Sequence, residues 1–183
     1  MAILKVARMG HPVLRQKCEP IPTDKIQAPE VQRLIRDMFE TMVEYSGVGL
    51  AAPQVHQPVR LLIAGGEEDA EGRPTFRIMI NPTITVLDGA KKLGMYEGCL
   101  SVPGMRGWVE RPDRIRVEAW NEKGELQDFT LEGFPAVVMQ HECDHLDGVL
   151  YVDRIEDTTR FAYEEEAARF LDLAGEDLEG EDE

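Results

Sequence analysis

Apolar residues recur at helical spacing in one early stretch of the chain. They lie three or four positions apart over residues 29–45, which places them on one face of a helix. Ser46 and Gly47 follow, and a glycine just beyond the last turn is a common helix stop. The pattern therefore predicts an amphipathic helix near the N-terminus. Its apolar positions are Val31, Leu34, Ile35, Met38, Met42 and Val43.

Strand patterns dominate the middle of the chain. Residues 114–120 alternate apolar and polar side chains, and a turn-like NEKGE segment leads to a returning run at 126–131. This combination predicts a hairpin. Further strands are expected at residues 59–64, 76–80 and 83–87, with a polar, glycine-punctuated loop after the first of them.

Two more helices are expected in the C-terminal third. Pro135 suits the first turn of a helix over residues 135–146, which Asp147 and Gly148 would end. Residues 158–174 predict a third, strongly charged helix. Because strands outnumber helices and follow one another, we predict an α+β fold, with antiparallel or mixed sheets packed around the helix at 135–146.

Composition and charge bound the class of protein. A length of 183 residues suits one compact domain, expected over residues 1–175, with an acidic and disordered tail at 176–183. The formal charge is −15, and residues 164–183 hold ten acids against Arg169 as the only base. The acidic segment 164–183 should not bind nucleic acid, since both carry negative charge.

Membrane insertion and export are not expected. The longest apolar runs fall far short of a bilayer span, and the N-terminus lacks the pattern of a signal peptide. The three cysteines, Cys18, Cys99 and Cys143, are not spaced as a disulfide framework. A reducing cytoplasm is the expected location.

The sequence QHECDHLDG at residues 140–148 suggests hydrolytic metal chemistry. His141 and His145 are four residues apart and would project from the same face of a helix toward one ion. Glu142 lies beside them, where it can take a proton from a metal-bound water. Such short patterns also arise by chance, and a catalytic metal normally has three protein ligands and one open position. The third ligand must come from elsewhere.

Several residues compete for the position of third ligand. Tyr151 occupies the place of a third histidine in one extended motif of metalloproteases, and it fits poorly. A second class of metalloproteases takes a glutamate from a following helix as third ligand. Glu164 and its two neighbours lie at a suitable distance along the chain, but their run of charges is typical of a solvent-exposed helix face. His11 and His56 lie next to prolines or turns. Cys99 lies in a segment without amphipathic spacing, so the pattern gives no reason for a buried cysteine there. A free cysteine is nevertheless most often a small buried side chain.

Three motifs resemble the signatures of the peptide deformylase family. They are GVGLAAPQ at residues 47–54, EGCLS at 97–101 and QHECDHLDG at 140–148, in the family's order and with similar spacing. The resemblance runs from about residue 7 to 155. It implies that Cys99 joins His141 and His145 around one divalent ion. Fe²⁺ is the ion that the resemblance implies, and Zn²⁺, Ni²⁺ or Co²⁺ would also suit these ligands.

The resemblance also implies an activity and its catalytic residues. Family members remove the formyl group from N-formylmethionyl nascent peptides and release formate. Glu142 would accept a proton from water and pass it to the departing amine. The side-chain amide of Gln54 and the backbone N–H of Leu100 would stabilise the negative charge that develops on the formyl oxygen.

Other residues are candidates for binding the substrate. The backbone at Gly47, Val48 and Gly49, and at Gly98, would pass close to the peptide, since glycine has no side chain and reaches positive φ easily. Val48, Phe134 and Val137 are candidates for a methionine pocket, although the last two fit plain core packing equally well. Arg106 would meet the substrate backbone, in a segment that varies among relatives.

Supporting contacts around the metal are expected from three charged residues. Asp144 precedes His145, and it would either orient a ligand histidine or remain a surface charge. Glu97 would pair with Arg111 beneath the site and make the EGCLS segment rigid. The expected partners are formylated nascent peptides and, transiently, the ribosome, with no strong affinity through the tail.

Three alternative functions use the same residues differently. A metalloprotease would cut internal bonds of unformylated peptides. A binding module would hold a purely structural metal, for which a fourth protein ligand is usual. A cysteine hydrolase would use Cys99 as a nucleophile and would need no metal.

Overall fold

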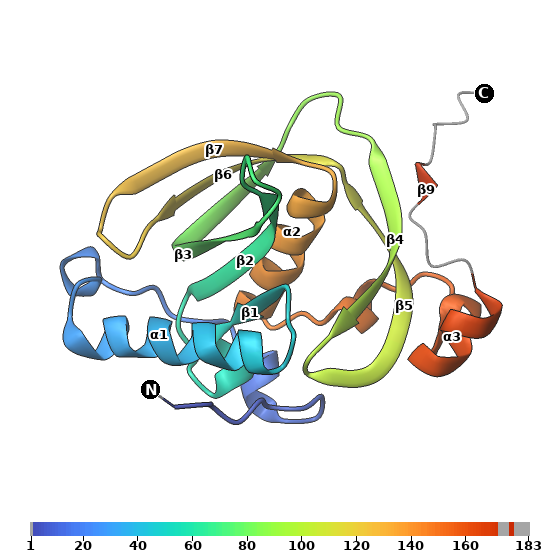
Figure 1. The fold of residues 1–183 in the computed structure, drawn as a ribbon, viewed down its shortest axis with the longest axis horizontal. Coiled ribbons are helices and arrows are strands. Elements are labelled where there is room, and N and C mark those ends of the chain that lie inside the picture. The colour runs from blue at the N-terminus through green and yellow to red at the C-terminus, as the bar shows by residue number, and fades with distance from the viewer. Residues whose placement is uncertain (1, 172–175, 178–183) are drawn as a thin grey trace.

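Two antiparallel sheets and one central helix form the body of the molecule (Figure 1). The computed structural model describes residues 2–171 and 176–177. Its helices are α1 (Pro29–Glu44), α2 (Phe134–Leu146) and α3 (Glu164–Phe170). Its strands are β1 (Gly49–Ala51), β2 (Leu61–Glu68), β3 (Pro74–Val86), β4 (Lys92–Cys99), β5 (Val102–Pro112), β6 (Arg114–Trp120), β7 (Leu126–Glu132), β8 (Phe161–Tyr163) and β9 (Glu176–Asp177). Short 3₁₀ helices are η1 (Pro12–Arg15), η2 (Thr23–Lys25), η3 (Ala52–Val55), η4 (Tyr151–Arg154) and η5 (Thr158–Arg160).

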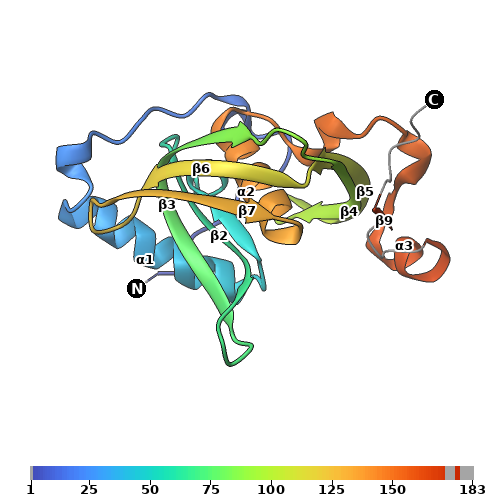
Figure 2. The ribbon, with the colours of Figure 1, turned by 90° about the horizontal axis from the view of Figure 1, so that it is seen from above.

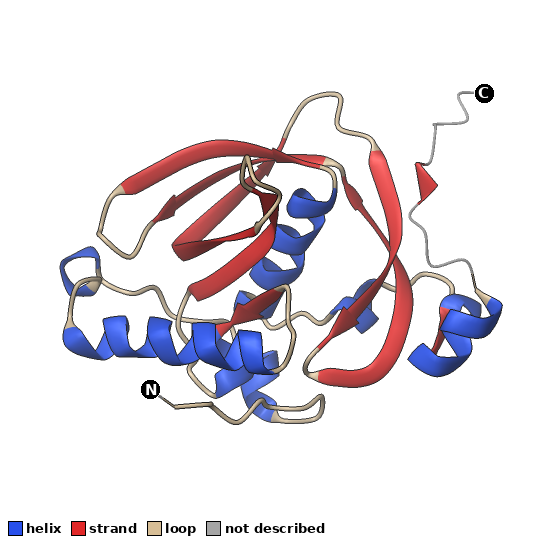
Figure 3. Ribbon diagram, viewed as in Figure 1, coloured by secondary structure: helices blue, strands red, loops and turns tan. Residues whose placement is uncertain are grey.

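The sheets have different sizes and lie on different sides of α2. The larger has five strands in the order β1-β2-β3-β6-β7, and the smaller has four in the order β8-β5-β4-β9. In Figure 3 the red strands surround the blue helix α2, and in Figure 2 β4, β5 and α3 lie together at one end of the molecule. The predicted α+β class and the central helix are confirmed.

Helix α2 is buried along most of its length. Gly133 precedes it with φ +67°, a conformation that favours glycine, and Pro135 occupies its first turn. Ala136, Met139 and Leu146 pack in an apolar cluster with residues of β2, β3, β6 and β7. An almost fully buried helix supplies a rigid support for the polar side chains that it carries.

Helix α1 is the amphipathic helix that the apolar spacing predicts. Ile35, Met38 and Met42 are buried and pack against β1 and β2. The helix ends at Glu44, and Ser46 then adopts a left-handed conformation with φ 55°. The N–H of Gly47 donates to the carbonyl of Met42 at 2.8 Å, so the start of the GVGLAAPQ segment is fixed by the helix end.

Some strands extend further than the sequence pattern predicts. The expected hairpin is present as β6 and β7. The expected strand at 59–64 begins later and continues to Glu68, into the predicted loop. The two strands expected at 76–80 and 83–87 form the single strand β3, with irregular pairing between Ile80 and Thr83. Asn81 lies at this irregularity with φ 52°, and its side chain binds the backbone of Ile21.

The predicted helix over residues 158–174 is wrong in its first half. The described segment begins with η5, continues as β8 and becomes helical only at Glu164. β8 forms backbone hydrogen bonds with the edge of β5, a long-range pairing that overrides local helical preference. Residues 172–174 of this prediction lie outside the described residues.

The tail differs from its prediction at the two positions that are described. Glu176 and Asp177 pair with Gly94 and Leu93 of β4 as strand β9, where disorder was expected. Residues 178–183 lie outside the described part of the chain. Among the described helices, none combines the length and apolar composition needed to cross a bilayer.

Candidate metal centre and active site

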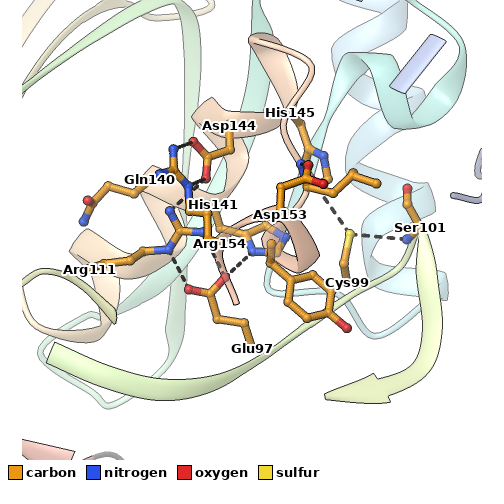
Figure 4. Close-up of polar contacts among 12 residues, drawn as sticks. Glu97, Cys99, Ser101, Arg111, Gln140, His141, Asp144, His145, Asp153 and Arg154 are labelled. Carbon is orange, nitrogen blue, oxygen red and sulfur yellow. Dashed lines mark hydrogen bonds and ion pairs between the residues drawn. The ribbon is translucent and has the colours of Figure 1, made fainter. Parts of the chain in front are cut away.

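Three side chains from two distant segments converge on one point (Figure 4). Cys99 is the last residue of β4, and His141 and His145 project from one face of α2. Their possible ligand atoms all lie within 4.8 Å of one another, and Cys99 Sγ is 3.3 Å from His145 Nε2. One sulfur and two imidazoles are a donor set that suits zinc, iron, nickel or cobalt.

Cys99 is positioned by the turn between β4 and β5. Leu100 and Ser101 form this turn, and the N–H of Ser101 donates to Cys99 Sγ at 3.4 Å. Gln54 Nε2 donates to the same sulfur at 3.4 Å and to Ser101 Oγ at 3.2 Å. The Gln54 amide is held in turn, because its Oε1 accepts a hydrogen bond from Ala51 N at 2.8 Å. Donors directed at sulfur stabilise a thiolate.

His141 is held by a buried ion pair beneath it. Its Nδ1 lies 2.7 Å from Glu97 Oε2, which leaves Nε2 directed toward the cluster. Arg111 binds the same carboxylate through Nε at 2.6 Å and Nη2 at 3.0 Å. Burial opposes ionisation of Glu97, but hydrogen bonds from His141 and Arg111 lower its pKa to about 2. The expected pairing of Glu97 with Arg111 is present.

Asp144 does not contact either ligand histidine. Arg111 Nη1 donates to its Oδ2 at 2.8 Å, and Arg154 binds both of its oxygens at 2.6 Å and 2.5 Å. Asp144 therefore acts on Arg111, and only through Glu97 on His141. Nδ1 of His145 has no hydrogen-bond partner in the described part of the chain, so direct orientation of His145 by Asp144 is not observed.

The electrostatics of the cluster favour a bound cation. Burial lowers the pKa of His141, but hydrogen bonds with Cys99 and Glu97 outweigh it and raise that pKa well above its usual value. Burial lowers the pKa of His145 well below its usual value, so this imidazole is neutral. The buried His141 imidazole keeps its proton although burial disfavours the charged form. The electrostatic potential at this place is therefore negative, which also favours a bound metal cation. The residues present therefore fit a divalent ion.

Glu142 lies beside the cluster without a hydrogen-bond partner for one oxygen. Burial raises the pKa of its carboxyl to about 7, and its Oε2 has no partner among the described residues. A Cβ at Gly49 would lie 2.3 Å from Glu142 Oε1, so only glycine leaves room for this carboxylate. Neither Gly47 nor Gly49 adopts positive φ, so the role of Gly49 is to let the backbone pass close to the Glu142 carboxylate.

A cavity of about 1140 Å³ opens over the cluster. Gly47, Val48 and Gly98 line it, together with Arg106, whose side chain is 36% exposed and therefore lies toward the mouth. Phe134 and Val137 also line it, the first about half exposed and the second 2% exposed. The structure thus brings all the predicted substrate-binding residues to one cavity.

Three further residues support this site, although the sequence pattern did not predict a supporting role for them. Ser101 accepts from Gln54 and donates to Cys99, and it lies inside the EGCLS motif that was available as a signal. Arg154 pairs with Asp144, a contact that no local pattern indicates. Tyr151, considered above as a replaced ligand, stacks on His141 with ring centroids 6.0 Å apart and donates to Met105 O.

Replacing Glu97 by glutamine should weaken metal binding about 10- to 100-fold, as for other residues that orient a metal ligand. The variant removes the carboxylate that binds His141 and leaves buried Arg111 with Asp144 as its remaining carboxylate partner. Metal titration by calorimetry would measure the change. Glu118→Gln, at a partly exposed position of β6 far from the cluster in sequence, is the matched control. Equal affinity in the Glu97 variant and wild type would contradict the role of this ion pair.

Only Cys99 should react readily with iodoacetamide in the folded metal-free protein at pH 8. Burial raises the pKa of the Cys18 thiol to about 11, and burial raises that of Cys143 further. Both are in the apolar core, whereas Cys99 is partly exposed at the cavity. Peptide mass spectrometry would locate the label, and added Zn²⁺ should protect Cys99. Labelling of Cys143 before Cys99 would be contrary to this arrangement.

Comparisons with known proteins agree on one family. A family model described as "Polypeptide deformylase" matches residues 3–161. A "Peptide deformylase" of Leptospira biflexa is 47% identical over 184 residues, covering 98% of this chain and 100% of that protein. The Met-Ala-Ser-bound class I type b peptide deformylase of Acinetobacter baumannii is similar in structure, with a TM-score of 0.76 at 34% identity over 84% of this chain and 99% of that one. The peptide deformylase of Thermotoga maritima gives a TM-score of 0.74 at 39% identity, covering 86% of this chain and 100% of that chain.

Proposed function

The chain belongs to the peptide deformylase family, and from this premise we propose how its own residues perform the reaction. As a member, it is a hydrolase that removes the N-formyl group from nascent peptides and releases formate. The family consists of metalloenzymes. The observation that carries the proposal is the convergence of Cys99, His141 and His145 beside Glu142, whose Oε2 has no partner among the described residues, at a cavity that Cys99, His141 and Glu142 line.

Cys99, His141 and His145 would hold the metal ion. A divalent ion in this position supplies Lewis acidity, which lowers the pKa of water and polarises the formyl carbonyl. We propose Fe²⁺, with Zn²⁺, Ni²⁺ and Co²⁺ as ions that the same donors accept. Thiolate ligation of Fe²⁺ predicts loss of activity on storage in air, and an iron form indifferent to air would argue against iron as the working ion.

Glu142 would act as the general base and then as the general acid. One oxygen of its carboxylate has no hydrogen-bond partner within residues 2–171, and the side chain lies next to the ligand face of α2. It would take a proton from the attacking water and deliver it to the amine nitrogen as the amide bond breaks. The glycine at position 49 leaves the space that this carboxylate needs.

Gln54 and Leu100 would stabilise the charge that develops on the formyl oxygen. The Gln54 amide is oriented by the Ala51 N–H, and its Nε2 is directed toward Cys99. The N–H of Leu100 follows Cys99 directly in the β4–β5 turn. Donors positioned before the reaction are the condition for this form of catalysis. Gln54 would exchange one of its Nε2 hydrogen bonds, to Cys99 or Ser101, for one to the formyl oxygen.

The rest of the cavity would bind the peptide. Val48, Phe134 and Val137 offer an apolar wall to the methionine side chain. Gly47 and Gly98 would lie beside the peptide backbone. Gly98 leaves room for the Arg106 guanidinium, which would donate hydrogen bonds to the peptide's carbonyl groups. Glu97, Arg111 and Asp144 would act indirectly, by holding His141.

An assay on formyl-Met-Ala-Ser tests the proposal. The metal-loaded protein should release formate from this peptide, and a chelator should abolish the activity. Met-Ala-Ser without the formyl group is the control, because an endopeptidase would act on it and a deformylase would not. Activity that survives complete metal removal would instead favour Cys99 as a nucleophile.

The cellular setting is part of the same proposal. The three cysteines are all free, which supports a reducing compartment such as the cytoplasm. We expect brief proximity to the ribosome during action on nascent chains and no direct binding of nucleic acid by the acidic C-terminal segment. Co-sedimentation with ribosomes that is lost on deletion of residues 176–183 would contradict the second expectation.

A further inference from the structure

Arg106 at the cavity mouth is bound by a residue of the C-terminal segment. Its Nε and Nη2 donate to Glu164 Oε1 at 3.1 Å and 2.5 Å, and both residues line the cavity. Glu164 is the first residue of α3. It lies outside residues 3–161, which the family model matches, so the contact belongs to a part of the chain that the family pattern does not cover.

The other side of Arg106 is fitted against the EGCLS segment. A Cβ at Gly98 would lie 2.5 Å from Arg106 Nη1 and 2.8 Å from Cζ. The guanidinium therefore lies directly over the residue before Cys99, in the space where a side chain at position 98 would begin. Glu164 occupies two N–H groups on one edge of the guanidinium, and the Nη1 group remains at the Gly98 side, near the metal cluster.

The backbone that carries Glu164 is anchored to β5. Tyr163 pairs with Met105, and Ala162 pairs with Arg106 itself. Arg160, just before β8, places its guanidinium carbon 3.4 Å from the ring centroid of Trp108 on the same strand. These contacts fix the start of α3 beside Arg106 without any contribution from the substrate.

We propose that Glu164 is a positioning residue that holds Arg106 over Gly98 and offsets its charge. The inference deepens the proposed function, because it assumes that Arg106 contacts the peptide beyond the formyl-methionine. With its charge balanced, Arg106 recognises backbone carbonyls through hydrogen bonds and gives acidic side chains no advantage. Glu164 thereby broadens the range of nascent chains that the enzyme accepts.

Kinetics of the Glu164→Gln variant test the proposal. KM for formyl-Met-Ala-Ser should rise about threefold to tenfold, because a hydrogen bond between charged groups is lost, while kcat changes less than about twofold. The ratio of kcat/KM for formyl-Met-Asp-Asp to that for formyl-Met-Ala-Ser should rise by a similar factor, since Arg106 is then a free cation. Formyl-methionine amide, which ends before Arg106, should show no change.

Two further variants separate positioning from general damage. Glu165→Gln changes the adjacent carboxylate, which has no contact with Arg106, and it should behave as wild type in both substrates. In an Arg106→Ala background, the Glu164→Gln change should have no further effect on KM. Unchanged KM and unchanged substrate preference in Glu164→Gln would overturn the proposal, and so would an equal loss of kcat on the long and short substrates. Wild-type release of formate in either case shows that the proposed function stands.

Discussion

Glu142→Gln should lower kcat/KM for a formyl-methionyl peptide by about 1,000-fold while the metal remains bound. Loss of a positioned general acid and base typically costs 100- to 10,000-fold. Glutamine keeps the shape of the side chain in the space that Gly49 leaves. It does not alter the three converging ligand atoms, which belong to other residues. The loss should therefore appear in kcat, with metal content near one ion per chain by elemental analysis.

The matched control for this experiment is Glu132→Gln, an exposed carboxylate at the end of β7. It should retain full activity and metal. Two results would refute the assigned role of Glu142. Full activity in the Glu142 variant would indicate a purely structural metal, and loss of the metal would indicate that the carboxylate is itself a ligand.

Cys99→Ala should lose nearly all bound metal and, with it, the release of formate. Two imidazoles alone do not hold a catalytic ion firmly, since such sites carry three protein ligands. The fold should persist, because Cys99 lies at the end of strand β4, which retains six described pairings with β5 and two with β9. Elemental analysis after dialysis and circular dichroism would measure metal and fold separately.

Cys143→Ala is the control for this variant. Its thiol is on α2 between the two ligand histidines, but it packs in the apolar cluster with Met139 and Leu146. It should keep the metal and the activity and lose about 1 kcal/mol of stability through the small cavity that forms. A Cys99→Ala protein that still contained one ion per chain would mean that another side chain completes the site.

The sequence predicted those features that depend on local spacing. The four-residue separation of His141 and His145 fixes both on one face of α2, and Pro135 marks where that helix begins. The apolar spacing of α1 likewise depends only on neighbours in the chain. These elements have nearly the bounds that were expected.

Features that depend on long-range strand pairing could be predicted only from the family resemblance, and some could not be predicted at all. No local rule brings Cys99 to α2, because its position depends on the β4–β5 hairpin. The register of that hairpin places Arg111 opposite Leu93, four residues before Glu97 on the same strand, and the Arg111 side chain reaches the Glu97 carboxylate from there. The C-terminal prediction failed for the same reason, since the partner of β8 is a strand far away in the sequence.

The polar network beneath the cluster also joins two separately packed parts of the molecule. Apolar residues of α2 cluster with the larger sheet, while Val102 and Val109 of β5 cluster with Tyr151, and Cys99 packs at the edge of that second group. Across this boundary, Glu97 meets His141, and Arg111 meets Asp144. The ion would therefore link these two apolar clusters through its ligands, with Cys99 on one side and His141 and His145 on the other. Removal of the ion should increase the rate of amide hydrogen exchange more at the tip of the β4–β5 hairpin than in the middle of α2.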